Sequence, residues 1–260
     1  MLLTWLGTAG FRVETAEGAI FLIDPFLSRP KEARPVLPIQ LTDLFPVDEI
    51  FLTHGRFDHA LDTPALVEQT GALVHAPTPV EQKLAELGVS THSLQPIKLK
   101  KVKRVGSLSW TAIPGRVNQL DASPSLRALI RNPAIFPEIQ TLDQQWPLGG
   151  IVAYLFRTNA YSMIHFGSAG WVDGEIGHLQ PDIALLPVES RPTKYSNSVR
   201  LTSILKPKIV IPHHWDDYYP SLSKTIDLSD FEAIVQAHAP NTKVHMPVIG
   251  QPFSPARLIS

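Results

Sequence analysis

The sequence contains no cysteine among its 260 residues, which excludes disulfide bonds, thiolate metal ligands and a cysteine nucleophile. It also lacks an excess of either charge, because 23 Lys and Arg face 24 Asp and Glu and leave a formal net charge of -1. No global field would therefore attract nucleic acid or an anionic membrane, and we expect neither as a partner. A metal site in this chain would need histidine and carboxylate ligands.

Long hydrophobic runs are absent as well. No stretch approaches the roughly 18 apolar residues that suggest a membrane span, and residues 1–7 lack the basic start of a signal peptide. Together with the lack of cysteine, these absences predict a soluble cytoplasmic protein. The chain does contain 44% apolar residues, enough for a substantial core, and no linker-like break divides it. We expect a single domain over residues 1–260.

Short apolar runs separated by turn residues predict strands along the whole chain. Near the start, runs at residues 2–6, 11–14 and 19–23 predict a β-meander. Further strands are predicted at residues 50–53, 72–75, 108–113, 151–156, 163–166, 183–187, 209–212 and 244–247. Helical patterns lie between them at residues 62–69, 78–87, 198–205 and 229–238. This alternation predicts layers of helices around a mixed sheet.

Residues 117–149 differ from the rest of the chain. They contain four prolines among scattered apolar residues, a pattern typical of an irregular or short-helical excursion rather than a core element. Because the stretch lies between two predicted strands, we expect it to form a cap or insertion near a functional site.

The strongest chemical signal is His54-Gly55-Arg56-Phe57-Asp58-His59, directly after the strand predicted at residues 50–53. Imidazole nitrogen and carboxylate oxygen are the ligands that a Zn²⁺-like ion takes when no thiolate is present. Adjacent Asp58 and His59 can face one ion only across a turn, so we expect a site carried by a loop rather than by a helix. Any other strand-end histidine, taken alone, is more simply explained as a hydrogen-bonded structural side chain.

The hexapeptide resembles the His-x-His-x-Asp-His motif of the metallo-β-lactamase superfamily. Further segments resemble the lactonase-like hydrolase branch of that family and follow its order: WLGTAGF at residues 5–11, FLIDPF at 21–26, HFGSAG at 165–170, PDIALLP at 181–187 and IPHHW at 211–215. The resemblance implies an α+β fold, a four-layer αββα sandwich whose metal-binding edge is built from loops at the strand ends. It also implies a metal-dependent hydrolase.

The resemblance identifies the metal ligands as His54, Asp58, His59 and His214, with the adjacent His213 as an alternative to His214. Three positions depart from the family pattern. Arg56 occupies the second motif histidine, Arg116 stands at or near the mid-chain histidine, and Ser168 stands where the bridging aspartate is expected.

These departures affect the two ion positions differently. Arginine cannot ligate a divalent cation, because its guanidinium stays protonated and offers no lone pair. The first position therefore keeps only His54, and we expect it to be empty. Asp58, His59 and His214 complete a three-ligand set for one divalent ion, Zn²⁺ first and Mn²⁺ or Fe²⁺ as alternatives. Loss of the bridging carboxylate also weakens metal binding by this set. The alternative is therefore a protein that binds no metal.

Arg56 and Arg116 suggest a different use of the first position. Two guanidinium groups near the site of a missing dication predict bidentate binding of a phosphate or carboxylate group of a small anionic substrate. The alternative is that each arginine pairs with a carboxylate of the chain and fills space.

Four further residues are predicted to support the centre. Asp24 is expected to orient a ligand histidine. Asp216 could ligate, orient His214 or cap the following turn, and the two roles without ligation are favoured. His165 is expected to support its loop, beside Ser168, which takes the place of the missing aspartate.

Three functions follow from these residues. The first is a metal-dependent hydrolase acting on an ester, lactone or phosphoester with an anionic group, in which Asp58 ligates the ion and orients the attacking water. The second is a catalytically inactive relative that binds an anionic small molecule or a protein. The third is a serine hydrolase using Ser168, which the text FGSAG disfavours because a nucleophile elbow reads G-x-S-x-G.

Overall fold

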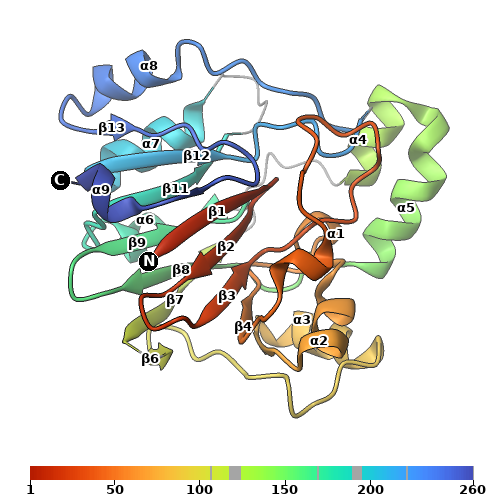
Figure 1. Cartoon of the computed structure of the whole chain (residues 1–260). Helices are drawn as coiled ribbons and strands as arrows, with labels where there is room; N and C mark the ends of the chain where they lie inside the picture. Colours follow the sequence, from red (N-terminus) through yellow and green to blue (C-terminus); the bar gives the residue numbers. More distant parts are fainter. Residues whose placement is uncertain (106, 117–123, 169, 189–194, 221, 260) are drawn as a thin grey trace.

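The structure is a computed structural model that describes residues 1–105, 107–116, 124–168, 170–188, 195–220 and 222–259. Two β-sheets lie face to face, with helices α1 to α3 against one sheet and α7 and α8 against the other (Figure 1). The expected α+β fold, a four-layer αββα sandwich, is confirmed.

The first sheet has the strand order β14-β1-β2-β3-β4-β5. Its members are β1 (Leu2–Gly7), β2 (Gly10–Glu14), β3 (Ile20–Ile23), β4 (Glu49–Phe51), β5 (Leu73–His75) and β14 (Pro252–Phe253). The predicted β-meander is confirmed, because β1, β2 and β3 pair antiparallel. Strands β3, β4 and β5 pair parallel, so their carboxyl ends meet at one edge of the sheet.

The second sheet has the order β10-β7-β8-β9-β11-β12-β13, with β6 also paired to β7. Its members are β6 (Val102–Val105), β7 (Leu108–Arg116), β8 (Val152–Arg157), β9 (Ser162–His165), β10 (Gly170–Trp171), β11 (Ile183–Pro187), β12 (Ile209–His213) and β13 (Lys243–Val244). Strands β9, β11 and β12 run parallel and deliver their carboxyl ends to a common edge.

Side-chain alternation along the strands builds three separate cores. In β3, Phe21 and Ile23 face the other sheet, whereas Leu22 faces the helices on its own side. In β11, Leu185 faces the first sheet and Leu186 faces α7 and α8. Because successive side chains point to opposite faces of a strand, fully apolar runs here mark strands buried on both faces.

The helices close the outer layers. They are α1 (Phe57–Ala60), α2 (Thr63–Thr70), α3 (Thr78–Glu86), α4 (Pro124–Arg131), α5 (Phe136–Gln145), α6 (Asp173–Ile176), α7 (Ser196–Leu205), α8 (Phe231–His238) and α9 (Pro255–Ile259), with 3₁₀ turns η1 (Leu41–Leu44) and η2 (Pro133–Ile135). The four predicted helices correspond to α2, α3, α7 and α8. None of the helices within the described residues is both long and apolar enough to cross a membrane.

One predicted strand is shorter than expected. The run at residues 244–247 is a strand only at Lys243–Val244, although the His245 amide still donates to the Val210 carbonyl. Pro247 has no amide hydrogen to continue the ladder.

The excursion predicted at residues 117–149 is mostly helical where the structure describes it. Residues 117–123 lie outside the described residues, residues 124–145 contain α4, η2 and α5, and residues 146–149 are irregular; α5 lies beside α1 (Figure 1). Leu148 accepts a hydrogen bond from the Gly55 amide at 2.9 Å, and Arg131 donates to the Leu222 carbonyl at 2.7 Å. The excursion thus contacts segments next to His54 and downstream of His214, and its role as a cap stays a prediction.

Candidate metal centre

The candidate ligands come from strand ends of both sheets. Asp24 follows β3, His54 follows β4 and His214 follows β12, all at carboxyl ends. Asp24 and His214 have φ angles of 44° and 61°, which are uncommon for residues other than glycine. Such strained backbone is concentrated at functional sites, where the surrounding structure holds it in place.

A carboxylate orients two imidazoles by a short chain of hydrogen bonds. Asp24 accepts a hydrogen bond from the Thr53 hydroxyl at 2.6 Å and from His59 Nδ1 at 2.9 Å. Because the Thr53 hydroxyl donates to Asp24, it accepts the hydrogen bond that links it to His54 Nδ1 at 2.9 Å. Both histidines therefore carry hydrogen on Nδ1 and present an Nε2 lone pair to the same space, the form in which imidazole binds a metal.

Asp58, His59 and His214 form one compact donor group. Their nearest donor atoms all lie within 4.8 Å of one another, and Asp58 Oδ2 is 4.0 Å from His59 Nε2 and 3.6 Å from His214 Nε2. All three side chains are buried. A second geometric grouping joins Asp24, His54 and His59. Since Asp24 Oδ2 bonds His59 Nδ1 rather than facing its Nε2, we assign Asp24 to orientation and not to ligation.

Electrostatics favours the states that ligation requires. Burial, together with the charges of His59 and Arg56, holds the pKa of His54 well below its usual value, so this imidazole is neutral. Burial alone would raise the pKa of Asp58, but His59, His214 and Arg56 outweigh it and keep that pKa well below its usual value. A neutral imidazole and an ionised carboxylate are the forms that bind a cation.

The expectation of a loop-borne site is wrong for two of the ligands. Asp58 and His59 belong to α1, a single helical turn in which the His59 amide donates to the Arg56 carbonyl. Gly55 precedes the helix at a crowded point, where a Cβ would lie 2.4 Å from the Pro147 carbonyl oxygen. Adjacent side chains in one helical turn diverge by about 100° and can still meet one ion from two sides.

Ser168 lies between the two oriented histidines. Its hydroxyl is 2.9 Å from His59 Nε2 and 3.4 Å from His54 Nε2. The preceding Gly167 has a φ of 63°, and a Cβ there would lie 2.2 Å from the Thr53 hydroxyl oxygen. Glycine is therefore required for the loop to bring Ser168 against the imidazoles. The Ser168 hydroxyl thus lies in the space that both Nε2 atoms face.

His165 and His213 lie behind the centre rather than in it. The Gly167 amide donates to His165 Nδ1, so His165 Nε2 carries the hydrogen and donates to the Ala9 carbonyl at 2.9 Å. Burial lowers the pKa of His165 to about 4. The His213 ring stacks on the His165 ring at 4.8 Å between the sheets. The geometry therefore identifies His214, and not His213, as the late member of the donor group.

Asp216 acts on His214 through the backbone. Its carboxylate accepts from the Thr8 amide at 2.9 Å, and the Thr8 carbonyl accepts from the His214 amide at 2.8 Å. Asp216 also forms a buried ion pair with Arg29 at 2.9 Å. Gly7 permits this approach, because a Cβ there would lie 2.3 Å from the Arg29 guanidinium.

The two arginines occupy different surroundings. Arg56 is half-buried immediately before α1, and its charge lowers the pKa of both His54 and Asp58. Arg116 is exposed at the end of β7, opposite Gly170 of β10. On α6, a hydrogen bond from Trp171, followed by the charges of Arg200 and Arg116, lowers the pKa of Asp173. The structure therefore brings Arg56, but not Arg116, into the electrostatic surroundings of the donor group.

The residues present fit a single divalent ion. The Asp58 Oδ1 atom is buried without a hydrogen-bond partner, an arrangement that costs free energy unless a cation or water completes it. The other carboxylate oxygen, Oδ2, lies beside His59 Nε2 and His214 Nε2, so Asp58, His59 and His214 offer the carboxylate and two-imidazole set of a catalytic site. The first ion position has no comparable set, because Arg56 and Ser168 supply neither imidazole nor carboxylate.

Comparison with known proteins decides the family. The model described as "Beta-lactamase superfamily domain" matches residues 20–215, most of the chain. The chain belongs to the metallo-β-lactamase superfamily. A metal-dependent hydrolase from Rubrobacter xylanophilus is 30% identical over 229 residues, which cover 83% of this chain and 82% of that protein. Another from Polynucleobacter asymbioticus is 28% identical over 240 residues, 90% of this chain and 80% of its relative.

Several solved structures share the fold. A metallo hydrolase from the archaeon Ignicoccus hospitalis has a TM-score of 0.71 and 20% identity, covering 97% of this chain and 98% of its own. An isothiocyanate hydrolase from Delia radicum gut bacteria has a TM-score of 0.67 and 17% identity, covering 98% and 99%. At these identities the likeness concerns the fold alone.

Three supporting residues of this superfamily member escaped the sequence reasoning. Thr53 links Asp24 to His54, Thr8 links Asp216 to His214, and Arg29 pairs with Asp216. Thr53 stands directly before His54, so a strand-end hydroxyl beside a ligand could have signalled its role. Nothing in the sequence points to the Arg29 and Asp216 pair, because its members are distant along the chain.

Proposed function

We propose that the chain is a hydrolase that uses one divalent ion, held by Asp58, His59 and His214, to cleave an ester, lactone or phosphoester carrying an anionic group. The observation that supports it best is the buried donor group, in which the hydrogen bond to Asp24 already sets the His59 tautomer for ligation. Its relatives are named metal-dependent hydrolases. We therefore favour an enzyme over a catalytically inactive binding protein.

A divalent ion in this group would supply Lewis acidity and lower the pKa of a bound water toward neutrality. Zinc suits the donor set best, with manganese and iron as alternatives. The protein's own residues provide the orientation. Asp24 and Thr53 fix the imidazoles of His59 and His54, and Asp58 is placed to orient a water through its second carboxylate oxygen.

His54 and Arg56 would act on the substrate side. The neutral His54 imidazole presents its Nε2 as an acceptor for a hydroxyl or water at the first ion position. Arg56 adds a positive charge beside the donor group and would hold a phosphate or carboxylate by paired hydrogen bonds. Arg116 stays a proposed second cation for a larger anionic group, farther from the donor group.

The test is chelator-sensitive turnover of two generic substrates, 4-nitrophenyl acetate and bis(4-nitrophenyl) phosphate. We expect chelation to abolish hydrolysis and added zinc to restore it. Arg56→Ala should raise KM about tenfold for the phosphodiester, since a charge-assisted bidentate contact is lost, and leave KM for the acetate unchanged. Arg200→Ala, which removes an exposed arginine paired with Asp173, is the matched control. Turnover that survives chelation would overturn the proposal.

One observation favours a second candidate, a metal-free serine hydrolase. The Ser168 hydroxyl is 2.9 Å from His59 Nε2, and His59 Nδ1 is 2.9 Å from Asp24 Oδ2. These two hydrogen bonds connect the residues in the order of a Ser-His-Asp triad. Ser168 and an ion would compete for the same His59 Nε2 lone pair. Stoichiometric labelling of Ser168 by a fluorophosphonate after chelation, blocked by zinc, would support this candidate; no labelling would remove it.

A further inference from the structure

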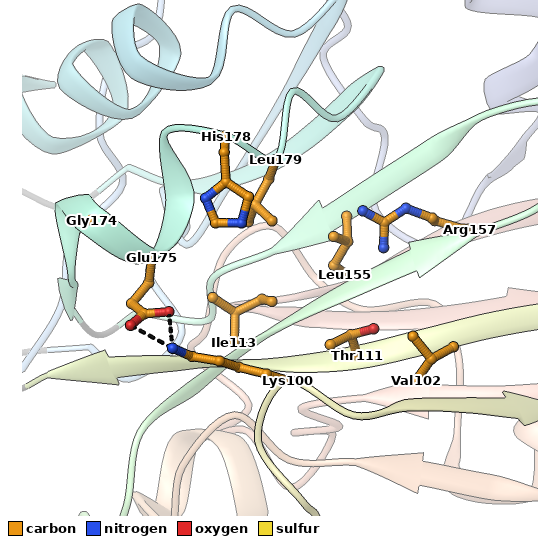
Figure 2. Close-up of a pocket in the computed structure, with 10 residues that line it drawn as sticks. All are labelled: Lys100, Val102, Thr111, Ile113, Leu155, Arg157, Gly174, Glu175, His178 and Leu179. Carbon is orange, nitrogen blue, oxygen red and sulfur yellow. Dashed lines mark hydrogen bonds and ion pairs between the residues drawn. The ribbon is translucent and has the colours of Figure 1, made fainter.

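A cavity lies away from the donor group, on the outer face of the second sheet. It measures about 400 Å³, within the range of small-ligand pockets of about 300–1,000 Å³. Strands β7 and β8 form its floor, and α6 with the residues that follow it forms one wall (Figure 2). None of the metal-centre residues lines it.

The floor of this cavity is apolar because of the strand register. Thr111 of β7 pairs with Val102 of β6 on one side and with Leu155 of β8 on the other. Ile113 lies two residues farther along β7 and faces the same side of the sheet. Leu155 and Ile113 belong to the core shared with α7 and α8, and both also line this cavity. Leu179 and the His178 ring lie on the α6 side of the same space (Figure 2). An apolar segment of a ligand would therefore rest on Leu155, Ile113 and Leu179.

The charges around the cavity are unevenly balanced. At one end, Lys100 pairs with Glu175 at 2.7 Å (Figure 2). At the other end, the register aligns Arg104, Ser109 and Arg157 across three strands, with two arginines flanking a hydroxyl. Within the part of the chain that the structure describes, neither arginine has a carboxylate within ion-pair distance. Among the described residues, this end of the cavity therefore carries positive charge that no ion pair balances.

Protection of an exposed sheet edge does not account for both arginines. Charged side chains on edge strands prevent edge-to-edge pairing, and β6 is an edge strand that carries Arg104. Arg157, however, belongs to β8, which is paired on both sides by β7 and β9. A second guanidinium on an interior strand, next to an apolar floor, is the arrangement that recognises an anionic head on an apolar body.

We propose that this cavity binds a small organic anion, a carboxylate attached to an apolar chain. The carboxylate would pair with Arg157, with Arg104 and the Ser109 hydroxyl beside it. The chain would lie over Leu155 and Ile113 toward Leu179. The site is separate from the metal centre, so its occupancy does not depend on the proposed hydrolase activity.

The test is a titration of the metal-loaded, full-length protein with sodium octanoate, followed by amide chemical shifts in NMR spectra. We expect saturable shifts at residues 109–113, 153–157 and 174–179. Arg157→Gln should weaken octanoate binding at least about fivefold, whereas Lys101→Gln, an exposed cation that does not line the cavity, should leave it unchanged. Acetate should bind much more weakly, because each buried methylene contributes about fourfold in affinity.

Three results would overturn the proposal. They are an absence of shifts in these segments, equal weakening by Arg157→Gln and Lys101→Gln, and equal affinity for octanoate and the neutral octanamide. Because Arg157 is exposed, its substitution is expected to leave the fold intact. Metal content measured on the same samples keeps failure of this site distinct from failure of the metal centre.

Discussion

The two ion positions at the edge of the sandwich share one orienting network but differ in what they can hold. Asp24 orients His59 directly and His54 through Thr53, so both imidazoles are set for ligation. Around His59, a carboxylate and a second imidazole complete a ligand set. The position around His54 has Arg56 and Ser168 in place of a carboxylate and a second imidazole.

The difference teaches that orientation and occupancy are separate properties of a metal site. The hydrogen bonds that set the His54 tautomer remain intact, although its position lacks the partners that would make an ion bind. Charge decides the outcome, because a guanidinium beside His54 both lacks a lone pair and repels a dication. Under the proposed function, the same charge at Arg56 would hold an anionic substrate.

The largest expected effect concerns His214. Its replacement, His214→Gln, should lower metal affinity about 1,000-fold or more and abolish turnover, exceeding the 10–100-fold typical of an orienting residue. His213→Gln should leave the metal content unchanged, since His213 stacks on His165 behind the centre. Elemental analysis of both variants checks this, with His178→Gln as an exposed control. Loss of metal from His213→Gln but not from His214→Gln would show that His213 is the late ligand.

The next effect breaks the network common to both positions. Asp24→Asn should weaken metal binding 10–100-fold, because the amide donates as well as accepts and no longer fixes the Nδ1 hydrogen of His59. Competition with a zinc indicator measures the affinity. The control is Asp182→Asn. Asp182 is a partly buried carboxylate far from the centre that accepts a hydrogen bond from the Ser162 amide, so its replacement should leave the zinc affinity unchanged. Equal loss in the two variants would mean that Asp24 serves only the fold.

A double variant that supplies the missing ligands to the first position tests the comparison further. Arg56→His combined with Ser168→Asp would give the first position the imidazole and carboxylate that it lacks beside His54, and should raise the metal content from about one ion per chain to about two. Each single substitution should leave it near one. Mass spectrometry of the intact protein under native conditions counts the ions, and a double variant that stays at one would refute the role given to these two side chains.

A last prediction concerns a pH dependence of stability that lies outside both ion positions. Burial lowers the folded pKa of His165 to about 4, below the unfolded value of about 6.5. The neutral ring therefore stabilises the fold above about pH 6.5, and this contribution, on the order of 3 kcal/mol, is lost as pH falls from 6.5 toward 4. The free energy of unfolding of His165→Gln, measured by urea titration, should fall less steeply over this range. If the free energies of unfolding of the two proteins fell equally steeply with pH over this range, His165 would not be the group responsible.

Much of the fold could be predicted because the apolar runs are short, regular and bounded by turns. The run 183–187 is the strand β11 residue for residue, and the register of β1 to β3 follows from Gly7 to Gly10 and the turn before Ile20. The helix α1 was missed because a single turn has too few residues for a 3.6-residue period to appear.

The donor group was predictable in part for a similar reason. Asp58 and His59 are neighbours in the sequence, and His214 stands out as a histidine at a strand end. The residues that support them were not predictable, because the hydrogen-bonded link from Asp216 to His214 passes through Thr8, at the opposite end of the chain. Contacts between distant segments depend on the folded packing and leave no local pattern.

The content of zinc, manganese and iron in untagged protein, purified without added metal, tests the unequal ion positions most directly. One ion per chain, lost on His214→Gln and retained on His54→Gln, is the predicted result. Two ions per chain, or a single ion that depends on His54 and not on His214, would contradict it.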